Sequence, residues 1–253
     1  MAQGEEAGFA VGVHLRARVL LGLLALSPGT AEAGDATGED TMPVLYQVLF
    51  FSTSDVGTDA RYSKLGVRYA PMGSIDTSGP VVTATFATGT YRYVKKRRFV
   101  RGVAAGLELA AGYQIQRPRF GIAAVAGPVA DYRALINFDP GNRNVGFQPA
   151  AIVALDGWAK PFPNVLATGY ARIESRRGGW YVKGFAGYEI RQELFLGPEG
   201  ALMQDGDYAE HLYGVSVVGL PARSFRAKVT AGLGANSDDR STRFLSVALW
   251  RRF

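Results

Sequence analysis

The residues that could perform catalysis are few, and His211 stands at the centre of the one candidate set. The sequence of 253 residues contains two histidines, and the other, His14, lies near the N-terminus. An enzyme built around His211 would need Glu210 or Ser216 to orient the imidazole or to act as its nucleophile. Both stand at odd offsets from His211, so in a strand their side chains point to the opposite face. The sequence therefore favours a non-enzymatic protein with no catalytic residue.

Metal and cofactor sites find equally little support. Asp205, Asp207 and Glu210 bring oxygen ligands close together, but they lack the spacing of a known calcium loop, so we expect a solvated acidic loop. The absence of cysteine excludes disulfide scaffolds, thiolate zinc sites and cysteine nucleophiles. The sequence also contains no phosphate-binding glycine loop, paired-histidine zinc motif or nucleophile elbow. We predict no metal and no cofactor.

The basic residues form one tight cluster, Lys-Lys-Arg-Arg at residues 95–98. The formal net charge is +6, from 28 basic and 22 acidic residues. The cluster could meet an anionic surface or polymer, but a solvated turn whose like charges keep a strand end from aggregating is the simpler interpretation. No recognition helix and no aromatic RNA-binding signature accompany it, so no nucleic-acid partner is predicted.

The first 33 residues have the pattern of an export signal. Arg16 and Arg18 precede an apolar run over residues 19–26, and Ala31 and Ala33 supply the small residues of a cleavage site. This run is too short to cross a bilayer, which needs about 20 apolar residues. The alternative is a short N-terminal helix. We predict a cleaved signal peptide over residues 1–33, followed by a single domain over residues 34–253.

The rest of the chain has the two-residue period of β-strands. Hydrophobic residues make up 47% of the sequence, which argues against disorder, and the 32 glycines have no three-residue period, which excludes collagen. Within residues 101–116 the odd positions are almost all apolar, whereas the even positions are small or polar. The runs between turn signals are residues 43–53, 61–71, 80–92, 100–116, 119–136, 145–159, 163–175, 179–190, 192–202, 208–219, 223–235 and 241–253. Twelve strands depend on a weak break between Ile190 and Glu193, which the even strand number of bacterial membrane barrels favours over eleven.

Two architectures fit alternating strands: a soluble β-sandwich or barrel, and an outer-membrane β-barrel. In a barrel that crosses lipid, the second face lines a lumen, where charged side chains of both signs would pair with one another. The sequence places such charges on that face. They are Glu108, Asp131, Arg133, Asp156, Arg172, Glu174, Lys183, Glu189, Arg226 and Lys228.

The C-terminal segment favours the membrane barrel. The chain ends in Phe253, and apolar residues occupy every second position back from it except Arg251, which resembles the last-strand signal that the outer-membrane assembly machinery reads. Trp250 and Phe253 are predicted to lie in an aromatic girdle at the membrane interface. We therefore predict an all-β fold: a single antiparallel transmembrane β-barrel of about 12 strands in the bacterial outer membrane, in contact with lipid and with the assembly machinery.

Two short segments carry a family resemblance. The first consists of Gly197, Pro198, Glu199 and Gly200, followed by the acidic residues Asp205 and Asp207. The second consists of Ser54 and Asp55, shortly after the aromatic Phe51. Together with strand order and length over residues 44–253, these segments resemble the cellulose biosynthesis protein BcsS family. Thr53 and the basic hairpin at residues 93–101 depart from the family pattern.

The resemblance implies an outer-membrane barrel associated with bacterial cellulose production, and no catalytic residue is carried over from it. We interpret residues 197–200 as a strand end or loop that Pro198 holds in a defined path by fixing one φ angle. Glu199 is expected to bond to the loop backbone or to a lumen arginine, with ligand contact as the lesser alternative. The expected function is a non-enzymatic accessory role in cellulose biosynthesis or secretion, with cellulose (a β-glucan) or secretion proteins as partners. The alternatives are a small solute-conducting pore and a lipid- or glycan-modifying barrel enzyme that uses His211.

Overall fold

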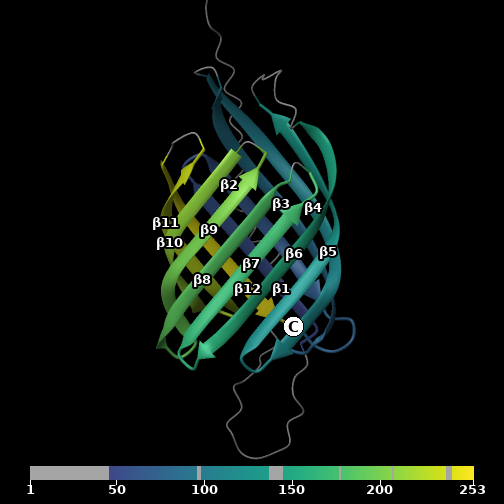
Figure 1. Cartoon of the computed structure of the whole chain (residues 1–253), viewed down its shortest axis with the longest axis vertical. Helices are drawn as coiled ribbons and strands as arrows, with labels where there is room; N and C mark the ends of the chain where they lie inside the picture. Colours follow the sequence, from purple (N-terminus) through teal and green to yellow (C-terminus); the bar gives the residue numbers. More distant parts are fainter. Residues whose placement is uncertain (1–45, 96–97, 137–144, 177, 207, 238–240) are drawn as a thin grey trace, which may run out of the picture. The chain divides into compact units, whose positions relative to one another are not determined.

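The computed structural model of the protein describes residues 46–95, 98–136, 145–176, 178–206, 208–237 and 241–253. The predicted signal peptide lies outside the described residues. The described chain forms twelve strands (Figure 1). They are β1 (Val48–Gly57), β2 (Ala60–Tyr69), β3 (Gly79–Lys95), β4 (Arg98–Arg117), β5 (Phe120–Leu135), β6 (Gly146–Phe162), β7 (Val165–Glu174), β8 (Trp180–Arg191), β9 (Leu194–Asp205), β10 (Tyr208–Ala222), β11 (Phe225–Asn236) and β12 (Ser241–Arg252). In this part of the chain, no helix has the length and hydropathy needed to cross a membrane.

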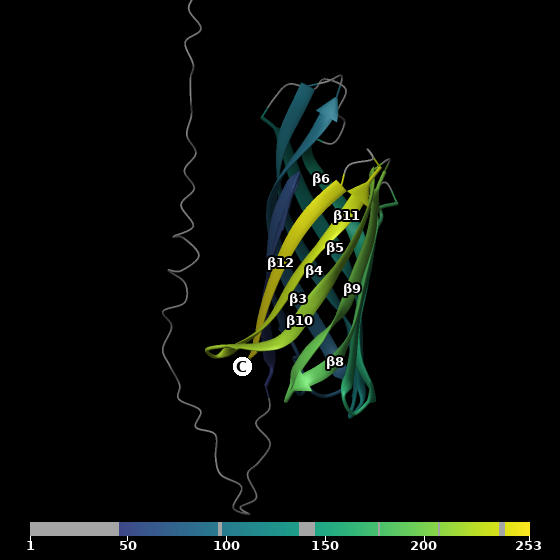
Figure 2. The ribbon, with the colours of Figure 1, turned by 90° about the vertical axis from the view of Figure 1, so that its left-hand side faces the viewer.

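The strands close into one antiparallel barrel. Each strand pairs with the next along the chain, and β1 pairs with β12, in a register that sets Leu49 opposite Arg252. Val48 and Phe253 exchange backbone hydrogen bonds of 3.0 and 2.8 Å at the seam. Closure leaves no strand edge unpaired, and Figure 2 shows the strands running obliquely to the long axis of the barrel, as closure requires. The predicted fold class is confirmed.

The uncertain break between the eighth and ninth strands is also confirmed. β8 ends at Arg191 and β9 begins at Leu194, which leaves a two-residue connection. Glu193 in this connection has a φ of 58°, and Arg223 in the equivalent connection between β10 and β11 has a φ of 55°. Non-glycine residues seldom adopt this region, so neither turn carries the glycine that would have marked it in the sequence.

The apolar face of the strands points outward. Leu107 and Leu109 in β4 are 51% and 50% exposed, whereas Glu108 between them is 7% exposed. The same alternation holds for the outward-facing Phe86 of β3 and Ile122 of β5, which lie opposite β4 residues on that face. A soluble sandwich would bury this face, whereas a barrel in lipid turns it toward the acyl chains. The outward face therefore fits the membrane barrel.

Apolar side chains also fill part of the interior. Ile75, in the connection between β2 and β3, belongs to a buried cluster with the inward-facing Val81, Val125 and Ile152. The side chain of Gln114 in β4 is 1% exposed, and its amide donates hydrogen bonds to the carbonyl oxygens of three residues of the connection. Part of the β2–β3 connection is therefore folded against the inner wall.

A second inward cluster corrects the prediction for Trp250. Trp250 packs against buried Phe185, Phe195 and Val218. The register explains this position, because Trp250 lies opposite Phe51 of β1 and Arg226 of β11, on the same face as the charged residues. The prediction that Trp250 lies in a membrane-facing girdle is therefore wrong. A one-residue step along a strand reverses the face, and Trp250 is out of phase with the outward-facing Leu245.

Candidate functional site in the barrel lumen

Ion pairs cross the lumen between strands that are not neighbours. The guanidinium of Arg68 in β2 donates two hydrogen bonds, of 3.0 and 2.5 Å, to the carboxylate of Asp156 in β6. Arg133 in β5 contacts Asp205 in β9 at 3.1 Å. Each pair is separated by three intervening strands, so its side chains must meet inside the barrel. The prediction that opposite charges pair across the lumen is confirmed.

The pair of Arg133 with Asp205 belongs to a longer network. Arg172 lies 3.6 Å from Glu108 and 3.2 Å from Glu174. Arg176 then links Glu174, at 3.1 Å, to Asp131, at 3.2 Å. Asp131 lies 4.0 Å from Arg133, and Arg133 reaches Asp205. The alternating sequence of charges offsets the desolvation that each would suffer alone in the interior.

Glu199 is the centre of a separate charged group, and it does not lie in a loop. It is in the interior of β9, opposite Phe185 of β8 and Gly214 of β10. Its side chain is only 2% exposed, and its carboxylate contacts the Nζ of Lys183 at 2.8 Å and the Nζ of Lys228. Thr230 donates a third contact from its Oγ1 at 3.2 Å. The partners of Glu199 are therefore two lysines and a threonine, not the loop backbone or the arginine that the sequence predicted.

The neighbours of Glu199 also have strand roles. A Cβ on Gly197 would collide with the carbonyl oxygen of Ala186, so β8 and β9 approach closely at this point. The pairing of β8 with β9 is interrupted next to Pro198, which has no N–H to donate. Glycine and proline here permit a close and locally interrupted strand pair, not a turn. Residues 197–200 are therefore part of the strand predicted over residues 192–202, and the alternative of a loop is wrong.

The other motif residues divide between the two faces and the barrel end. Asp55 faces inward, opposite Ser246 of β12. Ser54 faces outward, where its hydroxyl lies 3.2 Å from that of Ser63. Asp205 ends β9 and pairs with Arg133. Gly200 lies on the outward face of β9, and Asp207 lies outside the described residues. The structure therefore places Asp55 and Glu199, from two distant motifs, on the inner face of the barrel.

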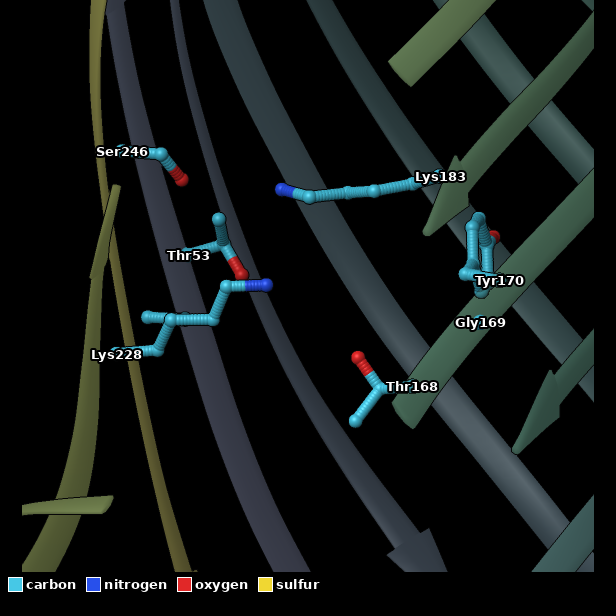
Figure 3. Close-up of a pocket in the computed structure, with 8 residues that line it drawn as sticks. Thr53, Thr168, Gly169, Tyr170, Lys183, Lys228 and Ser246 are labelled. Carbon is cyan, nitrogen blue, oxygen red and sulfur yellow. The ribbon is translucent and has the colours of Figure 1, made fainter. Parts of the chain in front are cut away.

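A cavity of about 190 Å³ lies inside the barrel beside this group. Its lining residues are Thr53, Thr168, Gly169, Tyr170, Lys183, Lys228, Ser246 and Ala248. Figure 3 shows that Lys228, Thr53 and Ser246 extend from one wall, whereas Lys183 and Thr168 extend from the opposite wall. The first wall consists of β11, β12 and β1, and the second of β7 and β8. Two ammonium groups and three aliphatic hydroxyls therefore line one space inside the barrel.

The residues that enzyme chemistry would need are not brought together. His211 is exposed on the outward face of β10, opposite Leu202 and Ala235. Glu210 and Ser216 lie on the inward face, and the Ser216 hydroxyl is 2.7 Å from that of Thr230. Across the residues that the structure describes, no cluster of three histidine or acidic side chains could hold a metal ion.

No sequence pattern marks the residues of the cavity as a site. Alternation places Lys183 and Lys228 on the lumen face, but nothing in the sequence marks them as partners, and no sequence signal points to Thr168 or Tyr170. Lys183 and Lys228 are 45 positions apart (228 − 183) and face each other across the interior. Alternation assigns each residue to a face, but the closure of the whole barrel decides which strands lie opposite.

Comparisons with known structures find the same kind of fold. The translocator domain of the autotransporter NalP from Neisseria meningitidis is 9% identical, with a TM-score of 0.50, over 87% of this chain and 90% of that chain. A KdgM porin is 14% identical, with a TM-score of 0.46, over 81% of this chain and 99% of that chain. The outer membrane protein Omp33 of Acinetobacter baumannii is 13% identical, with a TM-score of 0.40, over 82% of this chain and 98% of that chain. A search of curated proteins finds no match.

The family comparison covers nearly the whole barrel. The family described as cellulose biosynthesis protein BcsS matches residues 49–253, from the second residue of β1 to the C-terminal Phe253. The matched region includes the inward-facing Asp55 and Glu199 and both lysines of the cavity. The chain belongs to the cellulose biosynthesis protein BcsS family.

Proposed function

We propose that this protein is a non-enzymatic accessory protein of bacterial cellulose biosynthesis or secretion that resides in the outer membrane. The family match over residues 49–253 carries the proposal. The outward apolar face supports the location, because a closed barrel satisfies every backbone hydrogen bond within lipid. The proposed partners are membrane lipid, the assembly machinery that would read the end of the chain at Phe253, and cellulose or proteins that secrete it.

An outer-membrane location limits the step at which the protein can act. The nucleotide-sugar donor of polymerisation is in the cytoplasm, so an outer-membrane barrel acts on polymer that has already been made. Its role is then in export, anchoring or organisation of the glucan. Reaching this location requires export, and we expect cleavage after Ala33. Mass spectrometry of the membrane-extracted protein should show Gly34 as the first residue, and an intact Met1 would contradict the signal peptide.

A deletion strain tests the accessory role. We expect extracellular cellulose to fall or to change its texture, while synthase activity in isolated inner membranes stays near that of the parent strain. Expression of the full chain from a plasmid should restore the extracellular polymer. Normal cellulose outside the deletion strain, under conditions in which the parent strain makes it, would contradict the assignment.

A small solute-conducting pore is the second candidate, and the cavity in the lumen is the observation that favours it. The enzyme alternative is weaker, because His211 lies on the outward face, away from Glu210 and Ser216. Replacement His211→Ala in the complemented strain should leave extracellular cellulose unchanged. Loss of extracellular cellulose in that strain, with normal amounts of the barrel in the membrane, would support the enzyme alternative.

A further inference from the structure

We propose that the lumen cavity between Lys183 and Lys228 binds an anionic sugar through its carboxylate or phosphate group. The proposal goes beyond the accessory role in cellulose production and does not depend on it. It rests on the position of the two lysines, on the groups that line the cavity, and on the size of the space.

The lining offers hydrogen-bond donors and no carboxylate. Each lysine ammonium has three N–H donors and no acceptor. Glu199 engages both ammonium groups from one side, which leaves further donors on each. Glu199 itself is buried and does not line the cavity, and neither does Asp55. A ligand with several strong acceptor oxygens on one group, such as a carboxylate or phosphate, is the chemical complement of this lining.

The remaining groups and the volume point to a sugar. Thr53, Thr168 and Ser246 supply hydroxyls that both donate and accept hydrogen bonds. They come from both walls of the cavity (Figure 3), so one molecule with several hydroxyls can contact both walls. The volume of about 190 Å³ is below the roughly 300–1,000 Å³ of pockets for drug-sized ligands. The space therefore suits one monosaccharide unit, not a longer glycan.

Calorimetric titration of the purified, detergent-solubilised barrel tests the proposal. The probes are D-glucuronate for the carboxylate, glucose 6-phosphate for the phosphate, and D-glucose as the uncharged control, all in a buffer free of phosphate. We expect at least one anionic sugar to bind at least tenfold more tightly than glucose, and the tighter of the two identifies the anionic group. Equal affinity for glucose, or no binding of either anion, would overturn the proposal.

Three variants locate the site. Lys183→Gln and Lys228→Gln should each weaken binding of the anionic sugar at least tenfold. Lys64→Gln is the matched control, because Lys64 is an inward-facing lysine of β2 that does not line the cavity, and it should bind as the parent protein does. Equal loss in all three variants would show that the lumen attracts anions only through its general charge, which contradicts a defined site.

For a substitution at Glu199 we expect tighter binding, the opposite of the effect at the two lysines. Glu199→Gln preserves shape and removes the carboxylate that holds both ammonium groups, so affinity for the anionic sugar should rise. If Glu199 and the two lysines have a purely structural role, the affinity for the anionic sugar should fall or stay unchanged. Folding of each variant is checked by its heat-modifiable mobility in gel electrophoresis. If Glu199→Gln does not fold, Lys183→Gln still decides, because it leaves the contact between Glu199 and Lys228 in place.

Discussion

Glu199 and Gly197 meet two different structural requirements, a charged contact inside the barrel and a close approach of two strands. Glu199 must contact two lysines at once, and Gly197 must leave room for the backbone of β8. Glycine next to proline usually marks a turn, but here both residues lie within a strand. The reason for their presence is the distance between two strand backbones and a missing N–H donor. Neither the close approach nor the effect of the missing donor can be recognised from the sequence of one strand without knowing which strand pairs with it.

Gly197 should therefore tolerate substitution much less well than Gly200. In Gly197→Ala the new methyl group would meet the Ala186 carbonyl, whereas a Cβ at Gly200 has its nearest neighbour at 3.8 Å. We expect Gly197→Ala to lower the free energy of unfolding by about 1–3 kcal/mol, as overpacking does, and Gly200→Ala to change it little. Urea unfolding in lipid vesicles measures both. Equal effects would show that the strands do not approach as closely as the structure indicates.

At the scale of the strand, alternation predicts the face of a residue well and its surroundings poorly. It placed Leu107 outward and Gln114 inward, and both positions are confirmed. It does not show what occupies the space beside an inward residue such as Gln114. The β2–β3 connection occupies that space. Such a contact depends on how a loop folds back, which a periodic pattern does not contain.

The outward face can be tested at Leu107. Leu107→Arg places a charge on the lipid side and should cost about 2–4 kcal/mol if the site lies near the bilayer midplane. Leu107→Phe is the control, since it keeps an apolar side chain there and should fold as the parent protein does. Unfolding in lipid vesicles gives the comparison. Full tolerance of arginine at this position would argue against a membrane barrel.

The β2–β3 connection can be tested at Gln114. Gln114→Ala removes the amide that donates to the carbonyl oxygens of Ser74, Ile75 and Thr77. Buried carbonyl oxygens left without a donor lower the free energy of unfolding by about 1–3 kcal/mol. We expect a lower unfolding midpoint and faster proteolytic cleavage at exposed Met72, with cleavage elsewhere unchanged. An unchanged cleavage rate would show that Gln114 does not hold the connection in place.

At the scale of the whole molecule, the opposition of strands across the lumen is the property that the sequence contains least directly. Arg133 and Asp205 are 72 positions apart and meet because twelve strands close with one particular stagger. A change in strand number or stagger would set other residues opposite each other while leaving every strand's alternation intact. The charges in the lumen could therefore be predicted from the sequence, but their partners could not.

The ion pairs across the lumen predict the conductance of the barrel. Barrels of about 16–18 strands leave an aqueous channel, whereas here twelve strands enclose a lumen crossed by Arg68 with Asp156 and by Arg133 with Asp205. We expect the parent protein to conduct weakly in planar bilayers, and the double variant Arg133→Ala, Asp205→Ala to conduct more, because both side chains of one crossing pair are gone and no unpaired charge remains. Leu107→Phe, on the outer face, should conduct as the parent does. A large, stable conductance in the parent protein would favour the solute pore over the accessory role, and an unchanged conductance in the double variant would show that this pair does not obstruct the path of ions.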